Sequence, residues 1–375
     1  MSFAFEALRR RPDLEGPGLV AVDAADRLLL DESASAREGL GRGELVVIGD
    51  SYGALTLAAL HDGATAVRVH QDPLTGERAL EANAAELGIA AGTEAYASLP
   101  LDAELVRDAR VVLLRLPRSL EALRDIAGLV AAHAADDVVV FAAGRIKHIS
   151  PAMNDVLREF FQRLDVTHAR QKSRVLVARG PFGGRDPEPA GATVDGIRIR
   201  AFGGAFAGAR IDIGTRLLLA HLPETVEGGT ADDPLIDLAC GTGVVAAHLA
   251  LRHPDAAVLA TDQSAAAVSS ARATAAANGV ADRVRVVRDD GVGSRPDASA
   301  SCIALNPPFH AGAAVSDRLA PRLFGDAARV LRPGGELWCV WNSHLGYRPA
   351  LERLVGPTRQ VARNPKFTVT VSTRR

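Results

Sequence analysis

The fold class is decided by the stretch Pro234-Leu235-Ile236-Asp237-Leu238-Ala239-Cys240-Gly241-Thr242-Gly243-Val244-Val245-Ala246, in a chain of 375 residues. It begins with an apolar run of strand length, turns at two glycines, and continues with small apolar residues that suit the start of a helix. This order is typical of doubly wound α/β domains, which bind ligands at the carboxyl ends of parallel strands. The sequence therefore predicts a ligand site around Gly241 and Gly243.

The same strand, turn and helix order occurs at residues 44–58, and strands alternate with helices along most of the chain. Such alternation predicts parallel sheets covered by helices on both faces. We therefore expect an α/β protein with two tandem Rossmann-like domains, at residues 1–180 and 192–375, joined by a Gly- and Pro-rich linker at residues 181–191. Further expected elements are a short strand or helix at residues 19–30, a capped helix at residues 212–222, and strands at residues 67–70, 111–117, 138–141, 257–262, 284–287, 301–305 and 332–341.

Composition narrows the class of protein. Hydrophobic residues make up 47% of the chain, aromatic residues 4%, and the net charge is −2, as in ordinary globular proteins. No basic leader precedes an apolar core at the N-terminus, and no apolar run reaches the roughly 18 residues that span a bilayer. We expect a cytoplasmic protein without a membrane partner. The cysteines are too widely spaced for a zinc site and too few for a disulfide framework, so no metal is expected: Cys240, Cys302 and Cys339.

Positive charge is concentrated in the middle of the chain. Residues 141–210 hold 12 Lys and Arg against 6 Asp and Glu. A solvated surface is the ordinary meaning of such an excess, and a polyanionic partner would use it. The candidates for phosphate contacts are Arg145, Lys147, Arg170, Lys172, Arg174 and Arg179.

Three acids near the glycine turn indicate the kind of cofactor. Asp262 follows Gly241 by 21 residues and ends a predicted strand, where an acid binds ribose hydroxyls; NAD and other nucleoside cofactors share this feature. Asp237 precedes the turn and suits an ammonium group better than a pyrophosphate, which it would repel. Asp290 lies where an acid could accept from an adenine amine, with Asp289 as the competing choice. Together these residues favour S-adenosylmethionine.

Asn306-Pro307-Pro308-Phe309 follows the apolar run at residues 302–305 and completes the candidate site. Two prolines stiffen the loop and push the residue before them out of helical conformation. The side-chain oxygen of Asn306 and the carbonyl of Pro307 could accept from an exocyclic NH2 group, and Phe309 could stack on its ring. We expect these three residues to position a planar amine for methyl transfer, with no metal required.

The ordered set of glycine turn, ribose acid, adenine acid and Asn-Pro-Pro-Phe resembles the class I methyltransferases, and more narrowly the bacterial ribosomal RNA guanine-N2 methyltransferases. The resemblance covers most of the chain. It implies methylation of the N2 amine of a guanine in ribosomal RNA, with ribosomal RNA or a ribosomal subunit as partner. The stretches that carry it are residues 21–26, 171–174, 210–222, 241–243, 306–310, 342–345 and 364–367.

The resemblance also implies that the first domain is a degenerate, inactive copy of the methyltransferase domain, with a probable role in RNA recognition. The residues support duplication, because superposing Gly53 on Gly243 leaves the first copy without the acid and the first glycine. Its fourth strand ends in Leu116-Pro117-Arg118-Ser119, without an amide or a ring. In this superposition Val47 lies opposite Asp237, Ser51 lies opposite Gly241, and either Gln71 or Asp72 lies opposite Asp262.

Other functions remain open at this level. Asn-Pro-Pro-aromatic also serves adenine-N6 and protein glutamine-N5 methylation, so the choice of guanine depends on the resemblance. The glycine turn with Asp262 also fits a nicotinamide oxidoreductase, which would give Asn306 no role. The first half alone could act as a non-catalytic RNA-binding module.

Overall fold

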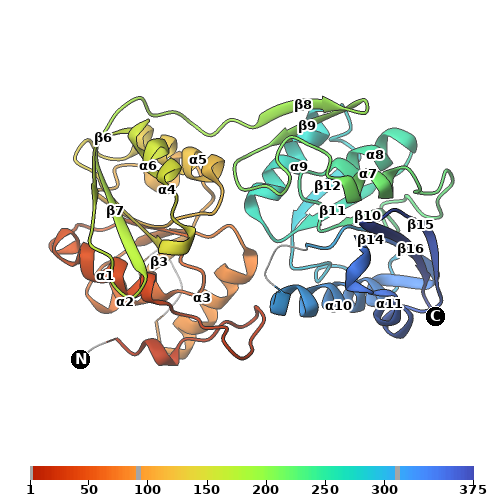
Figure 1. Ribbon diagram of the computed structural model, residues 1–375, viewed down its shortest axis with the longest axis horizontal. Coiled ribbons are helices and arrows are strands. Elements are labelled where there is room, and N and C mark those ends of the chain that lie inside the picture. Colours follow the sequence, from red (N-terminus) through yellow and green to blue (C-terminus); the bar gives the residue numbers. More distant parts are fainter. Residues whose placement is uncertain (1–2, 90–93, 309–312) are drawn as a thin grey trace. The chain divides into compact units, whose positions relative to one another are not determined.

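The computed structural model describes residues 3–89, 94–308 and 313–375. The chain divides into two compact units, Met1–Glu188 and Pro189–Arg375, and the division falls within residues 181–191. Each unit contains a seven-stranded sheet (Figure 1). No helix among these residues is long and apolar enough to cross a membrane.

The first unit has the strand order β3-β2-β1-β4-β5-β7-β6, with the last two strands antiparallel to their neighbours and the others parallel. Helices α1, α2 and α3 pack on one face of the sheet, and α4, α5 and α6 pack on the other. The elements are η1 Phe5–Ala7, α1 Ala24–Arg37, β1 Leu45–Ile48, α2 Ala54–His61, β2 Val67–His70, α3 Leu74–Glu86, β3 Tyr96–Ser98, α4 Ala103–Val106, β4 Val111–Arg115, α5 Leu120–His133, β5 Val139–Arg145, η2 Ile146–His148, α6 Pro151–Arg158, β6 Phe161–Val166 and β7 Ser173–Pro181.

The second unit repeats this topology in the order β12-β11-β10-β13-β14-β16-β15. Helices α7, α8 and α9 cover one face, and α10 and α11 cover the other. Trp338 packs into the first of these cores and Trp341 into the second. The elements are β8 Ala190–Val194, β9 Ile197–Ala201, α7 Ile213–Leu219, β10 Leu235–Leu238, α8 Val244–Arg252, β11 Val258–Asp262, α9 Ala265–Ala277, β12 Val284–Arg288, β13 Ala300–Leu305, α10 Ala313–Val330, β14 Leu331–Asn342, η3 Ser343–Leu345, α11 Arg348–Leu354, β15 Thr358–Arg363 and β16 Phe367–Thr373.

The structure defines two segments that the sequence left less certain. Residues 19–30, expected as a short strand or helix, contain the start of α1, which Asp23 begins through a capping box with Asp26. Residues 181–191, expected as a linker, begin with Pro181 at the end of β7, and the irregular stretch that follows up to Glu188 belongs to the first unit. The backbone N–H of Arg185 donates to the carbonyl of Gly128 in α5 at 3.1 Å.

The β8–β9 hairpin was not expected from the sequence. Strand β9 runs along α9, and polar side chains of that helix bond its backbone: Thr274 Oγ1 accepts from Arg200 N at 3.0 Å and Ser270 Oγ accepts from Phe202 N at 2.9 Å. An edge strand is thereby satisfied by a helix instead of another strand. Short polar residues in a helix carry no sequence signal for such a contact.

Gly243 begins α8 with a backbone φ of 74°, in the left-handed region. A Cβ atom at this position would lie 2.7 Å from the Cβ atom of Ala271 in α9. The turn after β10 therefore needs glycine for its conformation and for the close approach of the two helices.

We expect Gly243→Ala to destabilise the second unit more than Gly279→Ala. Gly279 has a similar φ of 69°, but a Cβ atom there would meet nothing within 4 Å. Both substitutions cost roughly 1 kcal/mol of left-handed strain, and overpacking against Ala271 adds about 1–3 kcal/mol at Gly243 alone. Urea unfolding followed by tryptophan fluorescence measures this, because Trp338 and Trp341 are the chain's two tryptophans. Equal midpoints for the two variants would contradict the packing argument.

Candidate functional site

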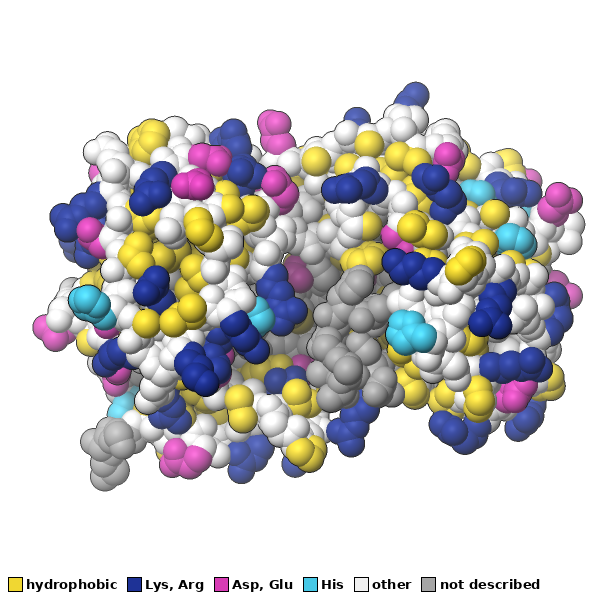
Figure 2. Space-filling model, in the orientation of Figure 1, with side chains coloured by type: hydrophobic (Ala, Val, Ile, Leu, Met, Phe, Trp, Pro, Cys, Tyr) yellow, Lys and Arg dark blue, Asp and Glu magenta, His cyan; other side chains and the backbone are white. Residues whose placement is uncertain are grey.

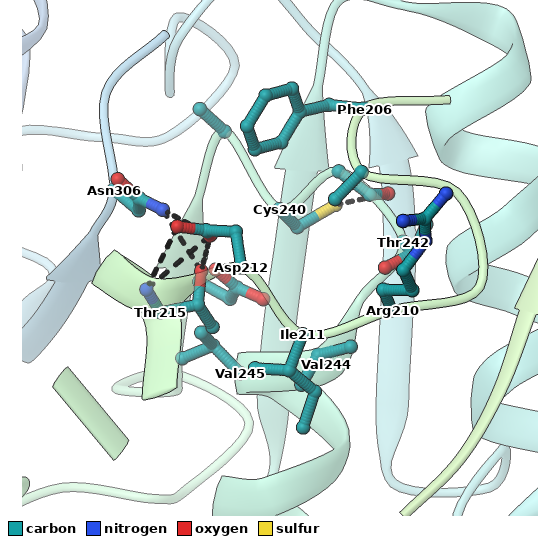
Figure 3. A pocket seen from close by; sticks show the side chains of 14 residues that line it. Phe206, Arg210, Ile211, Asp212, Thr215, Cys240, Thr242, Val244, Val245 and Asn306 are labelled. Atoms are coloured by element: carbon teal, nitrogen blue, oxygen red, sulfur yellow. Dashed lines mark hydrogen bonds between the residues drawn. The ribbon is translucent and has the colours of Figure 1, made fainter. Parts of the chain in front are cut away.

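A pocket opens at the carboxyl end of β10 (Figure 3). Its wall comes from the loop before α7, the first turn of α7, the glycine turn, the first turn of α8, and the end of β13. Of the residues predicted from the sequence, Asp237, Gly241 and Asn306 line this pocket. The lining also includes Phe206, Arg210, Asp212 and Thr215, which were not predicted as site residues.

Asp237 brings a buried acid to the pocket. Its carboxylate is 2% exposed and accepts from the backbone N–H of Ala246, in the first turn of α8, at 2.8 Å. Burial, together with the charge of Asp262, raises the pKa of Asp237 to about 7. No cationic side chain among the described residues forms an ion pair with it. Because an uncompensated buried carboxylate is unfavourable, the pocket suits a ligand that carries positive charge.

Asp262 connects the end of β11 to the glycine turn. Its carboxylate accepts from Gly241 N at 2.9 Å and from Ser264 N at 2.9 Å. These bonds orient the carboxylate of Asp262 at the end of β11, beside the glycine turn.

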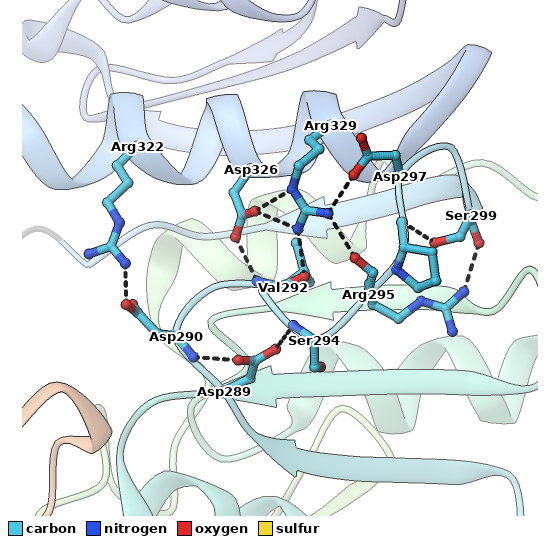
Figure 4. A network of polar contacts seen from close by, with 11 residues as sticks. Asp289, Asp290, Val292, Ser294, Arg295, Asp297, Ser299, Arg322, Asp326 and Arg329 are labelled. Atoms are coloured by element: carbon cyan, nitrogen blue, oxygen red, sulfur yellow. Dashed lines mark hydrogen bonds and ion pairs between the residues drawn. The ribbon is translucent and has the colours of Figure 1, made fainter. Parts of the chain in front are cut away.

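Asp289 and Asp290 follow β12 and have different surroundings (Figure 4). The buried carboxylate of Asp289 accepts from Asp290 N at 2.9 Å and from Ser294 N at 2.8 Å, so it holds the loop. The carboxylate of Asp290 pairs with Arg322 in α10. The two acids thus differ, since Asp289 bonds to its own loop and Asp290 to a helix on the other side of it, and the assignment of the adenine contact to Asp290 stays a prediction.

Asn306 directly follows the last residue of β13, and its amide nitrogen is held by two acceptors. Its Nδ2 atom donates to Asp212 Oδ2 at 3.0 Å and to Thr215 Oγ1 at 2.9 Å (Figure 3). Its Oδ1 atom is buried and has no hydrogen-bond partner among the described residues. Pro307 follows within the described chain, whereas Phe309 lies outside the described residues.

The sequence places Asp212 and Thr215 in a capped helix and in a stretch that carries the family resemblance, but assigns them no role at the site. Asp212 does cap α7, accepting from Gly214 N at 2.7 Å. The stretch Asp212-Ile213-Gly214-Thr215 carries a capping signal, but nothing local shows that the same carboxylate faces a residue 94 positions away. Only the position of α7 beside the end of β13 reveals it.

The first unit contains a counterpart of this arrangement. Strand pairing sets Ile48 beside Leu114 in one sheet and Leu238 beside Leu305 in the other, so Arg115 takes the position of Asn306. Arg115 pairs with Asp23, at 2.9 Å, and with Asp26. Asp23 and Asp26 stand at the cap and third positions of α1, as Asp212 and Thr215 do in α7.

Two expectations about the first copy are refined. The acid of the glycine turn is displaced instead of lost: the buried carboxylate of Asp50 accepts from Thr56 N at 2.9 Å, the counterpart of the bond between Asp237 and Ala246. In the first sheet His70 pairs with Ile48, and in the second sheet Thr261 pairs with the equivalent Leu238. Gln71, and not Asp72, therefore lies opposite Asp262.

The structure brings some of the predicted basic residues together and separates others. Arg145 ends β5 and lies in register beside Ser173, next to Lys172 and Arg174. Arg179 lies at the other end of β7, about 17 Å from Arg174 at strand spacing, and pairs with Asp165 at 2.9 Å. Arg170 pairs with Asp31 at 3.1 Å.

Several basic side chains at the carboxyl edge of the first sheet form no ion pair among the described residues. Burial, then the charges of Arg118, Lys147 and Arg145, lower the pKa of His148, so these cations lie close to that ring. Among the described residues, none of the following forms an ion pair: Arg118, Arg145, Lys147, Lys172 and Arg174. We call these five residues the basic edge. Figure 2 shows groups of Lys and Arg side chains on the visible face of the first unit.

Comparison with known proteins identifies the family. Residues 1–181 match the RLMG N-terminal domain, and residues 196–371 match the methyltransferase small domain. A ribosomal RNA large subunit methyltransferase G from Streptomyces avermitilis is 35% identical over 374 residues, which covers 97% of this chain and 95% of the relative. The protein of the same name from Pseudomonas aeruginosa is 33% identical over 376 residues, covering 98% and 97%. The chain belongs to the ribosomal RNA large subunit methyltransferase G family.

Membership in this family confirms the predicted resemblance and the expected class of enzyme, a methyltransferase that uses S-adenosylmethionine. A solved structure of the Thermus thermophilus 16S rRNA N2 G1207 methyltransferase with AdoMet and guanosine covers 100% of both chains, with 21% identity and a TM-score of 0.74. That likeness confirms the predicted fold class of two tandem Rossmann-like domains. Among the described residues no cluster of His, Cys, Asp or Glu could hold a metal ion.

Proposed function

We propose that this protein methylates the exocyclic N2 amine of a guanine in ribosomal RNA, and that the pocket at the end of β10 is the catalytic site. The observation that carries the proposal is Asn306, which lines a pocket containing the buried acid Asp237 and whose buried amide oxygen has no hydrogen-bond partner among the described residues. An acceptor beside a site for a cation is what transfer from a sulfonium to an amine requires. The names of the relatives support ribosomal RNA as the substrate.

The pocket residues fit the cofactor by charge. S-adenosylmethionine supplies an electrophilic methyl group and carries an ammonium and a sulfonium cation. Asp237, which lacks a cationic partner among the described residues, would hold the ammonium group, and Asp262 the ribose hydroxyls. Asp290 would accept from the adenine amine beside its ion pair with Arg322. Gly241, where a Cβ atom would meet nothing within 4 Å, would let the cofactor approach the backbone, and Gly243 would contribute by shaping the turn. A pyrophosphate would meet the charge of Asp237, which disfavours a nicotinamide cofactor.

Asn306 and Pro307 would orient the substrate. The lone pair of guanine N2 is delocalised into the ring, so the amine is a weak nucleophile until it becomes pyramidal. Acceptance of its two N–H groups by Asn306 Oδ1 and the Pro307 carbonyl would favour that geometry. Phe309 would stack on the base, a contact worth roughly 1–3 kcal/mol. The base must leave its stack in structured RNA to reach this site.

The first unit would bind the RNA backbone through the basic edge. Its five cations lack acidic partners among the described residues, so they are available to phosphates. Arg170 and Arg179, predicted from the sequence for the same role, are ion-paired and are left out of this proposal. A ribosomal subunit, as assembled particle or as its RNA, is the proposed partner.

The affinity for S-adenosylmethionine should increase with pH up to about 7, above which only the cofactor's own α-amino group, with an ordinary pKa of about 8, still titrates. Asp237 in the free protein has a pKa near 7, raised above the ordinary carboxyl value, so below that pH a bound cation must displace its proton. Each pH unit below the pKa then weakens binding by up to about tenfold. Calorimetry between pH 5.5 and 8.5 in buffers of different ionisation enthalpy measures both affinity and proton release. Asp237→Asn should bind weakly with no pH dependence below about 7, and a flat wild-type profile over that range would contradict the role of Asp237.

The proposed reaction is tested with labelled S-adenosylmethionine and ribosomal subunits from a strain that lacks the modification. Nucleoside analysis should recover N2-methylguanosine. Asn306→Ala should slow the reaction about 10²- to 10³-fold, the usual effect of removing one preorganised transition-state contact. Asn278→Ala is a matched control, since Asn278 holds the β8–β9 hairpin through Arg198. Label found only in protein, or in N6-methyladenosine, would exclude guanine-N2 methylation.

The basic edge predicts a change in the salt dependence of RNA binding. Replacing Arg118 and Lys147 together by glutamine should weaken binding of a ribosomal RNA fragment and lower the slope of log affinity against log salt by roughly one for each lost phosphate contact. Titrations between about 50 and 300 mM salt measure the slope. Arg179→Gln, at the opposite end of β7, should leave it unchanged. An unaltered slope in the double variant would exclude the basic edge as the RNA contact.

A further inference from the structure

Asn306 depends on two residues of α7 that the sequence did not single out. Its amide nitrogen donates one hydrogen to Asp212 Oδ2 at 3.0 Å and the other to Thr215 Oγ1 at 2.9 Å. We infer that Asp212 and Thr215 are positioning residues that fix the orientation of the Asn306 amide, so that its oxygen, and not its nitrogen, faces the substrate amine. This inference rests on the proposed function and deepens it.

The orientation follows from the chemistry of the partners. An amide can turn its NH2 or its oxygen to either side, but a carboxylate only accepts hydrogen bonds. Asp212 therefore selects the NH2 group. The hydroxyl of Thr215 donates to Asp212 Oδ2, so its oxygen accepts from Asn306. Both amide hydrogens are then engaged, and Oδ1 is left buried without a partner among the described residues.

Asp212 is itself held in place by the start of α7. Its Oδ1 atom accepts from Gly214 N at 2.7 Å and from Thr215 N at 3.4 Å. Gly214 packs against Phe367 of β16, where a Cβ atom would lie 2.9 Å from a ring carbon. The same N–H of Thr215 lies 3.3 Å from Oδ2, so both carboxyl oxygens hold Asp212 at the helix start, and Oδ2 also accepts from the Asn306 amide. Asp212 therefore holds the Asn306 amide without any movement of the chain.

The first unit shows the opposite outcome at the same place in the fold. There Arg115 replaces Asn306, and its guanidinium pairs with Asp23 and Asp26. Arginine has five donors and no acceptor, so this position cannot offer an oxygen to an amine. The first unit thus keeps two acceptors at the start of its helix, Asp23 and Asp26. At this position in the fold, the described residues provide an acceptor without a partner, Asn306 Oδ1, in the second unit alone.

The decisive variant is Asp212→Asn, which keeps the shape of the side chain. Its oxygen can still cap α7, but its nitrogen then faces the nitrogen of Asn306. Two donors repel, so the Asn306 amide turns and presents NH2 to the substrate N–H groups. We expect kcat for N2-methylguanosine formation to fall about 10²-fold, comparable with loss of one preorganised contact. Affinity for S-adenosylmethionine and Tm should change little.

A reciprocal exchange keeps the test independent of folding. Asn306→Asp alone places a carboxylate at residue 306 beside the carboxylate of Asp212, and the two repel. The kcat of this variant should be at least as low as that of Asp212→Asn. The two substitutions together restore a donor facing an acceptor, with one carboxylate oxygen of residue 306 turned to the substrate. We expect the double variant to recover at least about tenfold over either single variant, a coupling that independent sites do not show.

Thr215 provides a graded test. Thr215→Val leaves one hydrogen of the Asn306 amide without its acceptor and should lower kcat about tenfold, the effect of one hydrogen bond. Thr215→Ser restores the hydroxyl and should restore the rate. A fall in both variants would mean that Thr215 acts only by packing, which would overturn its assigned role.

A second readout requires neither RNA nor catalysis. The side-chain amide protons of Asn306, identified by their loss in Asn306→Ala, should exchange slowly with water in the wild type. They should exchange at least about tenfold faster in Asp212→Asn. Asp23→Asn, the matched control in the first unit, should change neither this exchange nor kcat.

The outcomes separate the inference from the function on which it rests. If the wild type forms N2-methylguanosine and Asp212→Asn retains its kcat, the positioning role is overturned. If the wild type forms no N2-methylguanosine, the proposed function fails. The amide-exchange comparison then still decides whether Asp212 fixes Asn306, with unchanged exchange in Asp212→Asn counting against it.

Discussion

The site depends on one constraint: an asparagine can offer its oxygen to a substrate only when its nitrogen is satisfied elsewhere. Asn306 meets this constraint because Asp212 and Thr215 take both of its amide hydrogens. The energetic consequence is an acceptor that is desolvated before any ligand arrives. A buried acceptor without a partner costs roughly 1–3 kcal/mol. That cost is removed when a donor of the right geometry enters the pocket.

The same reasoning explains the charge of the pocket. Asp237 is buried, accepts one backbone hydrogen bond, and lies near the charge of Asp262. Both effects make its ionised form unfavourable in the free protein and favourable beside a cation. Among the described residues, the pocket therefore combines an amide oxygen without a hydrogen-bond partner and a carboxylate without a cationic partner. Both are costly for folding, and both are complementary to an amine and a cationic methyl donor.

The two halves of the chain show how one topology carries different electrostatics. In the first unit the cap of α1 and the end of β4 form an ion pair between Arg115 and Asp23, in which opposite charges are matched. In the second unit the corresponding groups leave an acceptor open at Asn306. Unmatched charge in the first unit lies instead at its carboxyl edge, in residues such as Arg118 and Lys147. We interpret this as a division of roles, with stability and polyanion contact in one copy and chemistry in the other.

The sequence alone determined the fold class, the family and the position of Asn306, because strand runs, the glycine turn and the Asn-Pro-Pro-Phe order are local signals along the chain. It did not determine the β8–β9 hairpin, whose backbone bonds to side chains of α9. Nor did it separate Arg179 from Arg174, since charge counts ignore which end of a strand a residue occupies. The partnership of Asp212 with Asn306 spans 94 residues, and only tertiary packing of α7 beside β13 decided it. Local patterns specify elements, whereas contacts between distant side chains exist only once the sheet has assembled.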